Sequence, residues 1–344
     1  METRVAYLDI GRITLKTMPL SGRLAPNEVL VRLHQASICG SERYFYSGIT
    51  VRHQDEARNP EVKHIYPMGP LGHEGGGTII DIGVGVREYL GGGKISVGDR
   101  VGIISEPTYT DYWIFPSDSL QPIPEGVQFE TGCLYEPLGC AAWAGLHTGV
   151  RPGDYVAING AGFAGNILMQ GAKRLGASLT IVVDVADSKL DLAKKLGADV
   201  TINASKENPV DRVNEITDNE GVDVAIDAVG GTGVGMTQAL GQVKHNGIIV
   251  IYGDNYAPVK EFCFHRFHED GLYIRNLNSA HHTKLFMVEA FREAFRAVRR
   301  GVYDVQKILE HSKRYRLDDL PEVFEKESEN IEEQKSMKTL IGFD

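Results

Sequence analysis

The side chains best suited to chemistry fall in three short stretches: Ser37 to Glu42 (SICGSE), Gly72 to Glu74 (GHE) and Glu136 to Gly139 (EPLG). Thiolate, imidazole and carboxylate groups are the ligands that zinc accepts, and a catalytic zinc site leaves one further position open. Each stretch also has a simpler explanation when it is taken singly. A cysteine that ends an apolar strand is commonly a buried small hydrophobe, and a loop histidine or glutamate is commonly a hydrogen-bonded or solvated group.

A second candidate site is the glycine-rich stretch from Gly160 to Gly165 (GAGFAG), which follows the strand-like sequence YVAIN and precedes a helical pattern. In a dinucleotide-binding turn, Gly160 would permit the tight bend, Gly162 would let the backbone approach a pyrophosphate, and Gly165 would let the helix pack on the strand. Phe163 and Ala164 complete the turn as candidate cofactor-binding residues, and the N-terminus of the helix that follows would direct free N–H groups at the phosphates. The context therefore predicts a dinucleotide site.

Asp184 closes the next strand, where an acidic side chain can bond to both ribose hydroxyls of a nucleotide and would repel a 2′-phosphate. No arginine follows it directly, and Lys189 could close over the same ribose. This pattern favours NAD over NADP. The alternative is an ordinary strand-to-helix turn that carries an exposed aspartate.

The elements around this turn alternate strictly between strand and helix, and the strands carry Val and Ile on both faces, which predicts an α/β fold with a doubly wound parallel sheet. We expect helices at Gly165–Leu175 and Ser188–Leu196. The expected strands are Tyr155–Asn159, Leu179–Asp184, Val200–Asn203, Val222–Ala228, Gly247–Tyr252 and Leu272–Leu277.

The first 130 or so residues differ, because short β patterns alternate with glycine-rich turns such as Leu90–Asp99. A helical segment from Thr131 to His147 then leads into the alternating region, and the tail begins with a long helix, Lys284 to Arg300. We read Thr50–Pro67 as a solvated polar excursion. The expected early strands are Glu28–Ile38, Thr78–Ile82, Arg100–Ile104 and Asp111–Phe115.

Composition narrows the class of partner. The formal net charge of −10 argues against nucleic acid or an anionic membrane surface. No apolar run approaches the roughly 18 residues of a membrane span, and the N-terminal segment lacks the pattern of a signal peptide. We expect a cytoplasmic protein, because the four cysteines are scattered and contain no CxxC pair: Cys39, Cys133, Cys140 and Cys263.

Together, the three stretches and the glycine-rich turn resemble the zinc-containing alcohol dehydrogenases of the medium-chain dehydrogenase/reductase superfamily, and more closely their sorbitol-type branch. The resemblance spans the whole chain and includes a GDRV turn from Gly98 to Val101. It implies a GroES-like β-barrel catalytic domain at residues 1–137, completed by 277–344, and a Rossmann NAD-binding domain at 138–276. A homodimer or homotetramer is expected.

The resemblance assigns Cys39, His73 and Glu74 to one catalytic zinc ion. Glu136 matches a position that carries glutamate in polyol dehydrogenases, and it would bind the metal directly or through a water molecule. Cys140 is a possible substitute ligand, although we expect core burial for it. A second, structural zinc is not expected, because no cysteine occurs between Cys39 and Cys133.

In the mechanism that this resemblance implies, zinc lowers the pKa of a bound alcohol, and hydride passes from the alcohol carbon to the nicotinamide. Ser41 would carry the proton from the substrate, and Tyr44 or water would pass it on to solvent, with Glu74 completing the catalytic group. Tyr44 stands where relatives often have histidine, and Glu42 stands where they have aspartate. The expected substrate is a polyol, cyclitol or sugar-derived secondary alcohol.

Other interpretations are a ketone or aldehyde reductase of the same superfamily, including its zinc-free quinone reductase branch, and a non-catalytic protein that keeps the fold. A group of basic residues near the last strands leaves a phosphorylated or carboxylated substrate open, although a surface or subunit contact explains each equally well: His265, Arg266, His268, Arg275, His281 and His282.

Overall fold

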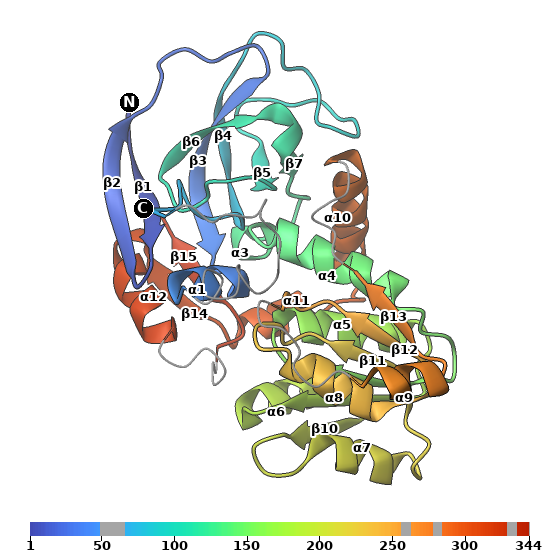
Figure 1. Cartoon of the computed structure of the whole chain (residues 1–344). Helices are drawn as coiled ribbons and strands as arrows, with labels where there is room; N and C mark the ends of the chain where they lie inside the picture. Colours follow the sequence, from blue (N-terminus) through green and yellow to red (C-terminus); the bar gives the residue numbers. More distant parts are fainter. Residues whose placement is uncertain (49–65, 256–262, 278–283, 329–335, 344) are drawn as a thin grey trace.

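The computed structural model describes residues 1–48, 66–255, 263–277, 284–328 and 336–343. The polar stretch Thr50–Pro67 falls almost wholly outside this part, as do His281 and His282. Figure 1 shows two bodies: a β-rich one formed by the beginning and end of the chain, and an α/β one formed by the middle. In the described part of the chain, we find no helix with both the length and the apolar character needed to cross a bilayer.

The β-rich body contains a two-stranded hairpin and a seven-stranded sheet ordered β14-β15-β3-β4-β5-β7, with β6 pairing to β3. Apolar side chains on the inner faces of β3 and β4 are buried, as expected of alternating half-buried strands. Its strands are β1 (Glu2–Asp9), β2 (Arg12–Pro19), β3 (Glu28–Ser37), β4 (Gly75–Ile82), β5 (Arg100–Ile103), β6 (Tyr112–Pro116), β7 (Leu120–Pro122), β14 (Lys313–Arg316) and β15 (Thr339–Gly342).

The α/β body is built on a six-stranded, wholly parallel sheet in the order β10-β9-β8-β11-β12-β13. This is the strand order of a dinucleotide-binding fold: the chain adds strands to one side of β8 and then returns to add the remaining strands to its other side. The strands are β8 (Tyr155–Asn159), β9 (Leu179–Asp184), β10 (Val200–Asn203), β11 (Val222–Asp227), β12 (Val243–Ile251) and β13 (Tyr273–Asn276).

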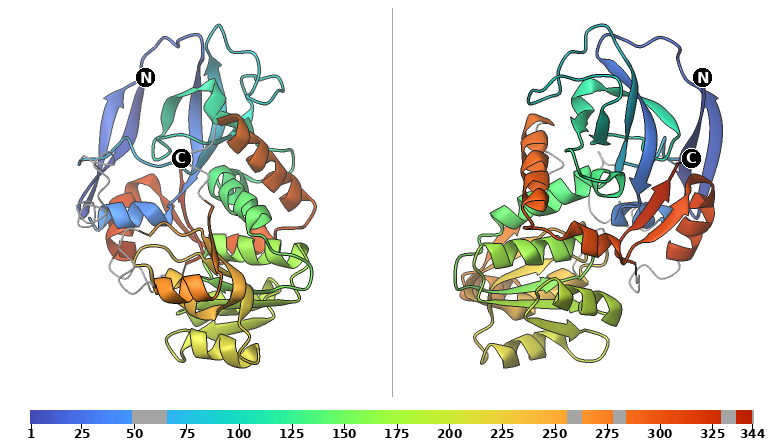
Figure 2. Two further views of the ribbon diagram at one scale, coloured as in Figure 1. Left: turned by 45° about the vertical axis from the view of Figure 1, so that its right-hand side comes forward. Right: turned by 180° about the vertical axis from the view of Figure 1, so that it is seen from behind.

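Helices cover both faces of this parallel sheet and connect the two bodies (Figure 2). The helices are α1 (Gly40–Tyr46), α3 (Phe129–Gly132), α4 (Tyr135–His147), α5 (Phe163–Arg174), α6 (Asp187–Lys195), α7 (Pro209–Ile216), α8 (Val234–Gln242), α9 (Phe264–Glu269), α10 (Lys284–Arg299), α11 (Val305–Leu309) and α12 (Leu320–Ser328). Two short 3-10 turns span Ser117–Ser119 and Leu317–Asp319.

The long helices α4 and α10 pack against each other through aromatic rings. The Tyr135 ring stacks on Phe295 at 4.8 Å between centroids and meets Phe291 edge-on at 5.5 Å. A Cβ at Gly139 would lie only 1.6 Å from the Phe291 ring, so glycine allows the helices to approach this closely. The start of α4, which includes Glu136, is thereby held against the core.

The expected α/β class, the GroES-like body and the parallel sheet agree with the structure, and the predicted strands match to within a few residues. The helix expected at Thr131–His147 is interrupted: Thr131 and Gly132 end α3, which begins at Phe129, and α4 starts at Tyr135, after Cys133 and Leu134. The helix expected at Gly165–Leu175 starts earlier in the structure, because α5 begins at Phe163. The chain does return to the first body, since β15 pairs antiparallel with β3. The exact domain boundaries stay a prediction.

Candidate active site

The glycine-rich turn between β8 and α5 has the geometry that a pyrophosphate requires. Gly160 has a φ of +106°, which side chains rarely adopt, and a Cβ at Gly165 would lie 1.8 Å from the Gly160 carbonyl oxygen. By contrast, a Cβ at Gly162 would meet nothing within 4 Å. The turn is therefore tightly packed toward the sheet and open toward solvent, where the N-terminus of α5 emerges.

The acidic residue at the end of β9 is held in place by the backbone. Asp184 accepts hydrogen bonds from the amides of Ala161, at 2.8 Å, and Ala186, at 3.0 Å. Lys189 is buried nearby, and burial lowers the pKa of its ammonium group, with a further lowering by the charge of Arg43 and an opposing rise from Asp184. Arg43 itself comes from α1 and pairs with Glu327 at 2.7 Å.

Three of the four predicted metal ligands meet. Cys39 caps the N-terminus of α1, and His73 and Glu74 directly precede β4; Sγ of Cys39, a ring nitrogen of His73 and a carboxylate oxygen of Glu74 all lie within 4.8 Å of one another. Burial alone would lower the pKa of the His73 imidazole, but the charges of Cys39 and Glu42 outweigh it and raise the pKa well above its ordinary value. The negative charges of Cys39 and Glu42 therefore both act on this one imidazole.

Glu42, in the first turn of α1, orients this cluster. Its carboxylate lies 3.2 Å from Nδ1 of His73 and accepts a hydrogen bond from the Cys39 amide at 3.1 Å. The buried phenol of Tyr109 donates to the same carboxylate at 2.5 Å and also lies 3.1 Å from the Ser37 carbonyl oxygen. Nδ1 faces Glu42, which leaves Nε2 as the ring nitrogen that can bind a metal. This arrangement is common for metal-binding histidines.

Glu74 has no exposed surface and is compensated by a cation that sequence reasoning missed. Lys338, just before β15, lies 2.6 Å from each Glu74 carboxylate oxygen, and the Ser37 hydroxyl donates to the same group. Burial lowers the pKa of the Lys338 ammonium group, but the charges of Glu74 and Cys39 raise it above the ordinary value overall. Its Nζ also lies 5.4 Å from the centroid of the Phe163 ring, so one lysine contacts both candidate sites.

Glu136 lies close to this cluster but outside the 4.8 Å group. The charges of His73, Glu74 and Lys338 all act on it, although burial has the largest effect and raises the pKa of its carboxyl group. Its Oε1 accepts a hydrogen bond from Sγ of Cys140 at 3.0 Å. Cys140 is half-buried and packs against the core, as expected in part, and its thiol also faces Glu136 because the two residues are one helical turn apart on α4.

The two predicted proton-transfer residues lie in different surroundings. The Ser41 hydroxyl donates to Sγ of Cys39 at 3.2 Å, so it lies at the metal cluster. The Tyr44 hydroxyl lies against Gly231, in the loop after β11, where a Cβ on that glycine would be 2.3 Å away. Tyr44 thus joins α1 to the nucleotide-binding body.

Two further residues near the cluster escaped the sequence analysis as functional groups. Burial raises the pKa of the Tyr252 phenol well above its ordinary value, and the charges of Cys140 and Glu136 add to that rise. Burial likewise raises the pKa of Glu106, which interacts with His73. Tyr252 could have been found, because it follows β12 at the carboxyl edge of the parallel sheet, where ligands bind in such folds.

The basic residues near the last strands have structural partners where the chain is described. Arg266 pairs with Asp270 at 3.0 Å and donates to the carbonyls of Leu240 and Val243. Arg275 donates to the His147 carbonyl at 3.1 Å. His265 and His268 are exposed on α9. These contacts favour a structural role for the two arginines.

The donor set fits zinc. A thiol, an imidazole and a carboxylate converge at a distance that one small cation can bridge, and the surrounding carboxylates Glu42 and Glu136 leave the cluster rich in negative charge. A carboxylate has about four acceptor sites, so the pairing of Glu74 with Lys338 leaves capacity for a metal. Such an arrangement can bind and polarise an alcohol oxygen beside a nucleotide.

Comparison with known proteins agrees with this geometry. Residues 25–125 match the model of the alcohol dehydrogenase GroES-like domain, and residues 164–298 match that of the zinc-binding dehydrogenases. An uncharacterized zinc-type alcohol dehydrogenase-like protein, YdjJ of Escherichia coli, is 30% identical over 252 residues, which cover 66% of this chain and 70% of that protein. The chain belongs to the zinc-type alcohol dehydrogenase family.

The chain is also similar to a characterised enzyme by name and to a solved structure. Rat sorbitol dehydrogenase is 30% identical over 229 residues, covering 60% of this chain and 61% of that protein. The solved structure of a zinc-binding dehydrogenase from Sinorhizobium meliloti, bound to NADP, superposes with a TM-score of 0.80 over 99% of both chains at 22% identity. The chain is thus an oxidoreductase of the zinc type.

Proposed function

We propose that this dehydrogenase oxidises a secondary alcohol of the polyol, cyclitol or sugar-derived class, using one catalytic zinc ion and NAD. The observation that carries the proposal is the convergence of the Cys39, His73 and Glu74 donor atoms within 4.8 Å. The ion pair of Glu74 with Lys338 supports it, because Lys338 also contacts Phe163 in the first turn of the nucleotide-binding helix. Among the relatives, the sorbitol dehydrogenase of rat is named for a polyol and a D-xylulose reductase of Aspergillus niger for a ketose sugar, which is consistent with this class of substrate.

A bound zinc ion would supply the Lewis acidity that makes the substrate hydroxyl acidic near neutral pH. Cys39, His73 and Glu74 would hold it, with Glu136 as a further ligand, direct or through water. The Ser41 hydroxyl, which lies beside Cys39, would relay the substrate proton: it takes up that proton as it passes its own to the cofactor ribose, from which Tyr44 or water carries a proton to solvent. Glu42 keeps His73 in one ring orientation, and the open face of Gly162 lets the cofactor pyrophosphate approach the backbone.

Support for NAD comes from the end of β9. The Asp184 carboxylate is anchored by two backbone amides, so it cannot easily swing away from a 2′-phosphate, and like charges there would repel. Arg43 is already paired with a buried carboxylate, that of Glu327. An Asp184→Ser variant should therefore gain relative preference for NADP, measured as the ratio of kcat/KM for the two cofactors.

The decisive experiment is a metal analysis of the purified protein, followed by assays of polyols, cyclitols and sugar alcohols with NAD and with NADP. We expect one tightly held zinc ion per chain and NADH formation with at least one secondary alcohol. Two tightly held zinc ions per chain would contradict the single-site proposal. A preference for NADP in the unmodified protein would contradict the role of Asp184, and activity that survives zinc removal would contradict the mechanism.

A further inference from the structure

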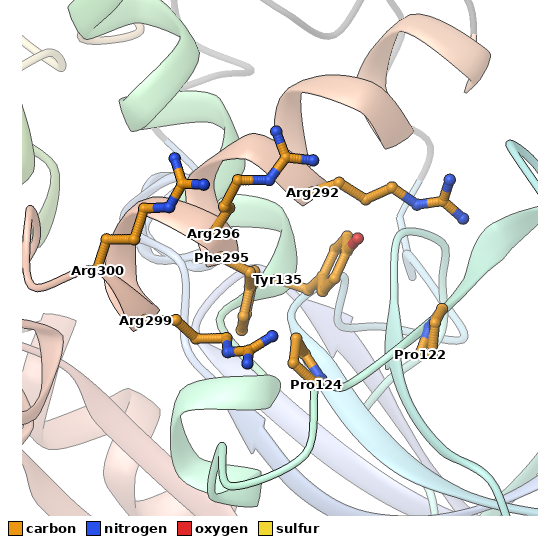
Figure 3. Close-up of a pocket in the computed structure, with 8 residues that line it drawn as sticks. All are labelled: Pro122, Pro124, Tyr135, Arg292, Phe295, Arg296, Arg299 and Arg300. Atoms are coloured by element: carbon orange, nitrogen blue, oxygen red, sulfur yellow. The ribbon is translucent and has the colours of Figure 1, made fainter.

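A second recess lies between α10, the start of α4 and the segment that follows β7. Its volume is about 600 Å³, within the range of small-molecule sites, and it is lined by Pro122, Pro124, Tyr135, Arg292, Phe295, Arg296, Arg299 and Arg300 (Figure 3). Half of the lining residues are arginines. None of the residues proposed for the metal or the nucleotide lines it.

The charge of this recess, which we call the arginine pocket, is unusual for the molecule. The chain carries a formal net charge of −10, yet among the described residues no carboxylate lines the pocket. The positions of Arg299 and Arg300 at the C-terminus of α10 explain part of this positive charge, because cations stabilise the C-terminus of a helix. It does not explain a concave surface with four guanidinium groups, since like charges one helical turn apart repel one another.

Two of the arginines are fixed and two are available. Arg292 donates to the carbonyls of Leu90, Gly91 and Gly92 and to the Gln121 side chain, and Arg296 pairs with Glu293. In the described part of the chain, the exposed guanidinium groups of Arg299 and Arg300 make no hydrogen bond or ion pair. One guanidinium group can donate two parallel hydrogen bonds to the oxygens of a phosphate. Two adjacent guanidinium groups without protein partners are therefore suited to binding a phosphate.

The apolar residues of the pocket walls indicate a ligand larger than an inorganic ion. The rings of Tyr135 and Phe295 lie among the guanidinium groups in Figure 3, with the two prolines on the other side, so apolar surface adjoins the charge. We propose that the arginine pocket binds a small phosphorylated organic molecule at a site separate from the substrate and the cofactor. This inference does not depend on the proposed reaction, because binding here needs neither zinc nor turnover.

The pocket is also connected to the metal cluster. Tyr135 lines it and precedes Glu136 in the first turn of α4, and the charge of Arg292 acts on the Tyr135 phenol. A ligand that packs against Tyr135 would therefore act on the turn that positions Glu136. We expect the bound molecule to change kcat rather than to compete with the alcohol.

Calorimetric titration with inorganic pyrophosphate and with fructose 6-phosphate, at constant ionic strength and with saturating NAD, tests the proposal. Saturating NAD keeps the probes out of the nucleotide turn, and a parallel titration without NAD covers the case of weak cofactor binding. The test variant is R299Q/R300Q, and the control is R23Q/R151Q, which removes the same charge from two exposed arginines elsewhere.

We expect one binding event per chain, at least tenfold weaker in R299Q/R300Q and unchanged in R23Q/R151Q. Equal binding by all three proteins, or equal loss in both variants, would overturn the proposal, the latter by showing a diffuse charge effect. Inorganic phosphate is titrated alongside these probes, and fructose 6-phosphate that binds no more tightly than inorganic phosphate would overturn the organic part of the proposal. A change of particle mass in R299Q/R300Q, without probe binding to the unmodified protein, would identify a subunit contact instead.

Discussion

Replacing Tyr109 by phenylalanine removes one oxygen atom from a fully buried position without changing the shape of the ring. The lost hydroxyl donates to the Glu42 carboxylate at 2.5 Å, and hydrogen bonds to charged groups contribute about 1.5–3 kcal/mol to stability. Glu42 then keeps its 3.1 Å bond from the Cys39 amide but holds His73 less firmly. Disturbing a partner of a metal-binding histidine commonly costs about 10- to 100-fold in metal affinity or activity.

A matched control exists in the same body of the protein. The Tyr89 hydroxyl donates to the Asp99 carboxylate at 2.7 Å, and that carboxylate also accepts from a backbone amide, that of Ser96, as Glu42 does. Tyr89→Phe should therefore lose a similar free energy of unfolding, because it breaks a bond of the same kind far from any metal ligand. The unfolding free energy is measured for both variants by chemical denaturation.

The distinguishing measurement is the affinity for zinc, by competition with a chelator, together with kcat and KM. We expect Tyr109→Phe to bind zinc at least tenfold more weakly and to turn over more slowly, while Tyr89→Phe keeps both properties. If the two variants lose equal stability and both retain full zinc affinity and turnover, Tyr109 serves only packing, and the chain of contacts from Tyr109 through Glu42 to His73 has no effect on the metal.

Three further variants test neighbouring parts of the site. Glu136→Ala should lose about 10- to 100-fold in zinc retention or turnover with little change in NAD affinity, whereas an unaltered zinc content and rate would remove Glu136 from the site. Lys338→Met strands a buried carboxylate and should lower the unfolding free energy by about 3–5 kcal/mol, while Lys338→Arg keeps most of it; equal stability of the two variants would contradict the ion pair with Glu74. Gly165→Ala should lower the melting temperature because its methyl group meets a backbone oxygen, but Gly162→Ala should melt normally and bind NAD more weakly, and the reverse pattern would refute the assigned glycine roles.

The parts of the fold that could be predicted from sequence are those fixed by neighbours along the chain. The buried Val and Ile runs of β8, β9 and β11 identified the parallel strands, and the three glycines of the turn have the expected local geometry. Cys140 packs against the core and also donates to Glu136, because a small thiol suits both a core and a polar site. Helix spacing alone placed it beside Glu136.

The missed residues of the site depend on contacts between distant parts of the chain. Lys338 is 264 positions away from Glu74, and Tyr109 is 67 positions away from Glu42. Neither has a motif of its own, and each owes its role to sheet pairing that brings it beside the cluster. Sequence patterns identify candidate ligands, but the buried counterions and hydrogen-bond donors that orient those ligands emerge only from tertiary structure.

The pairing of β15 with β3 has a consequence for the way in which the protein is made. A ribosome releases β3 and β4 early, together with Cys39, His73 and Glu74, but β15 leaves only after the whole parallel sheet has been synthesised. Because domains tend to fold as they emerge, the nucleotide-binding body can become ordered while the edge formed by residues 35–37 of β3 still lacks its partner strand and Glu74 still lacks its lysine. During synthesis, that edge and that carboxylate would be exposed to other chains and to free cations, and the emergence of Lys338 and Thr339–Gly342 would end this exposure.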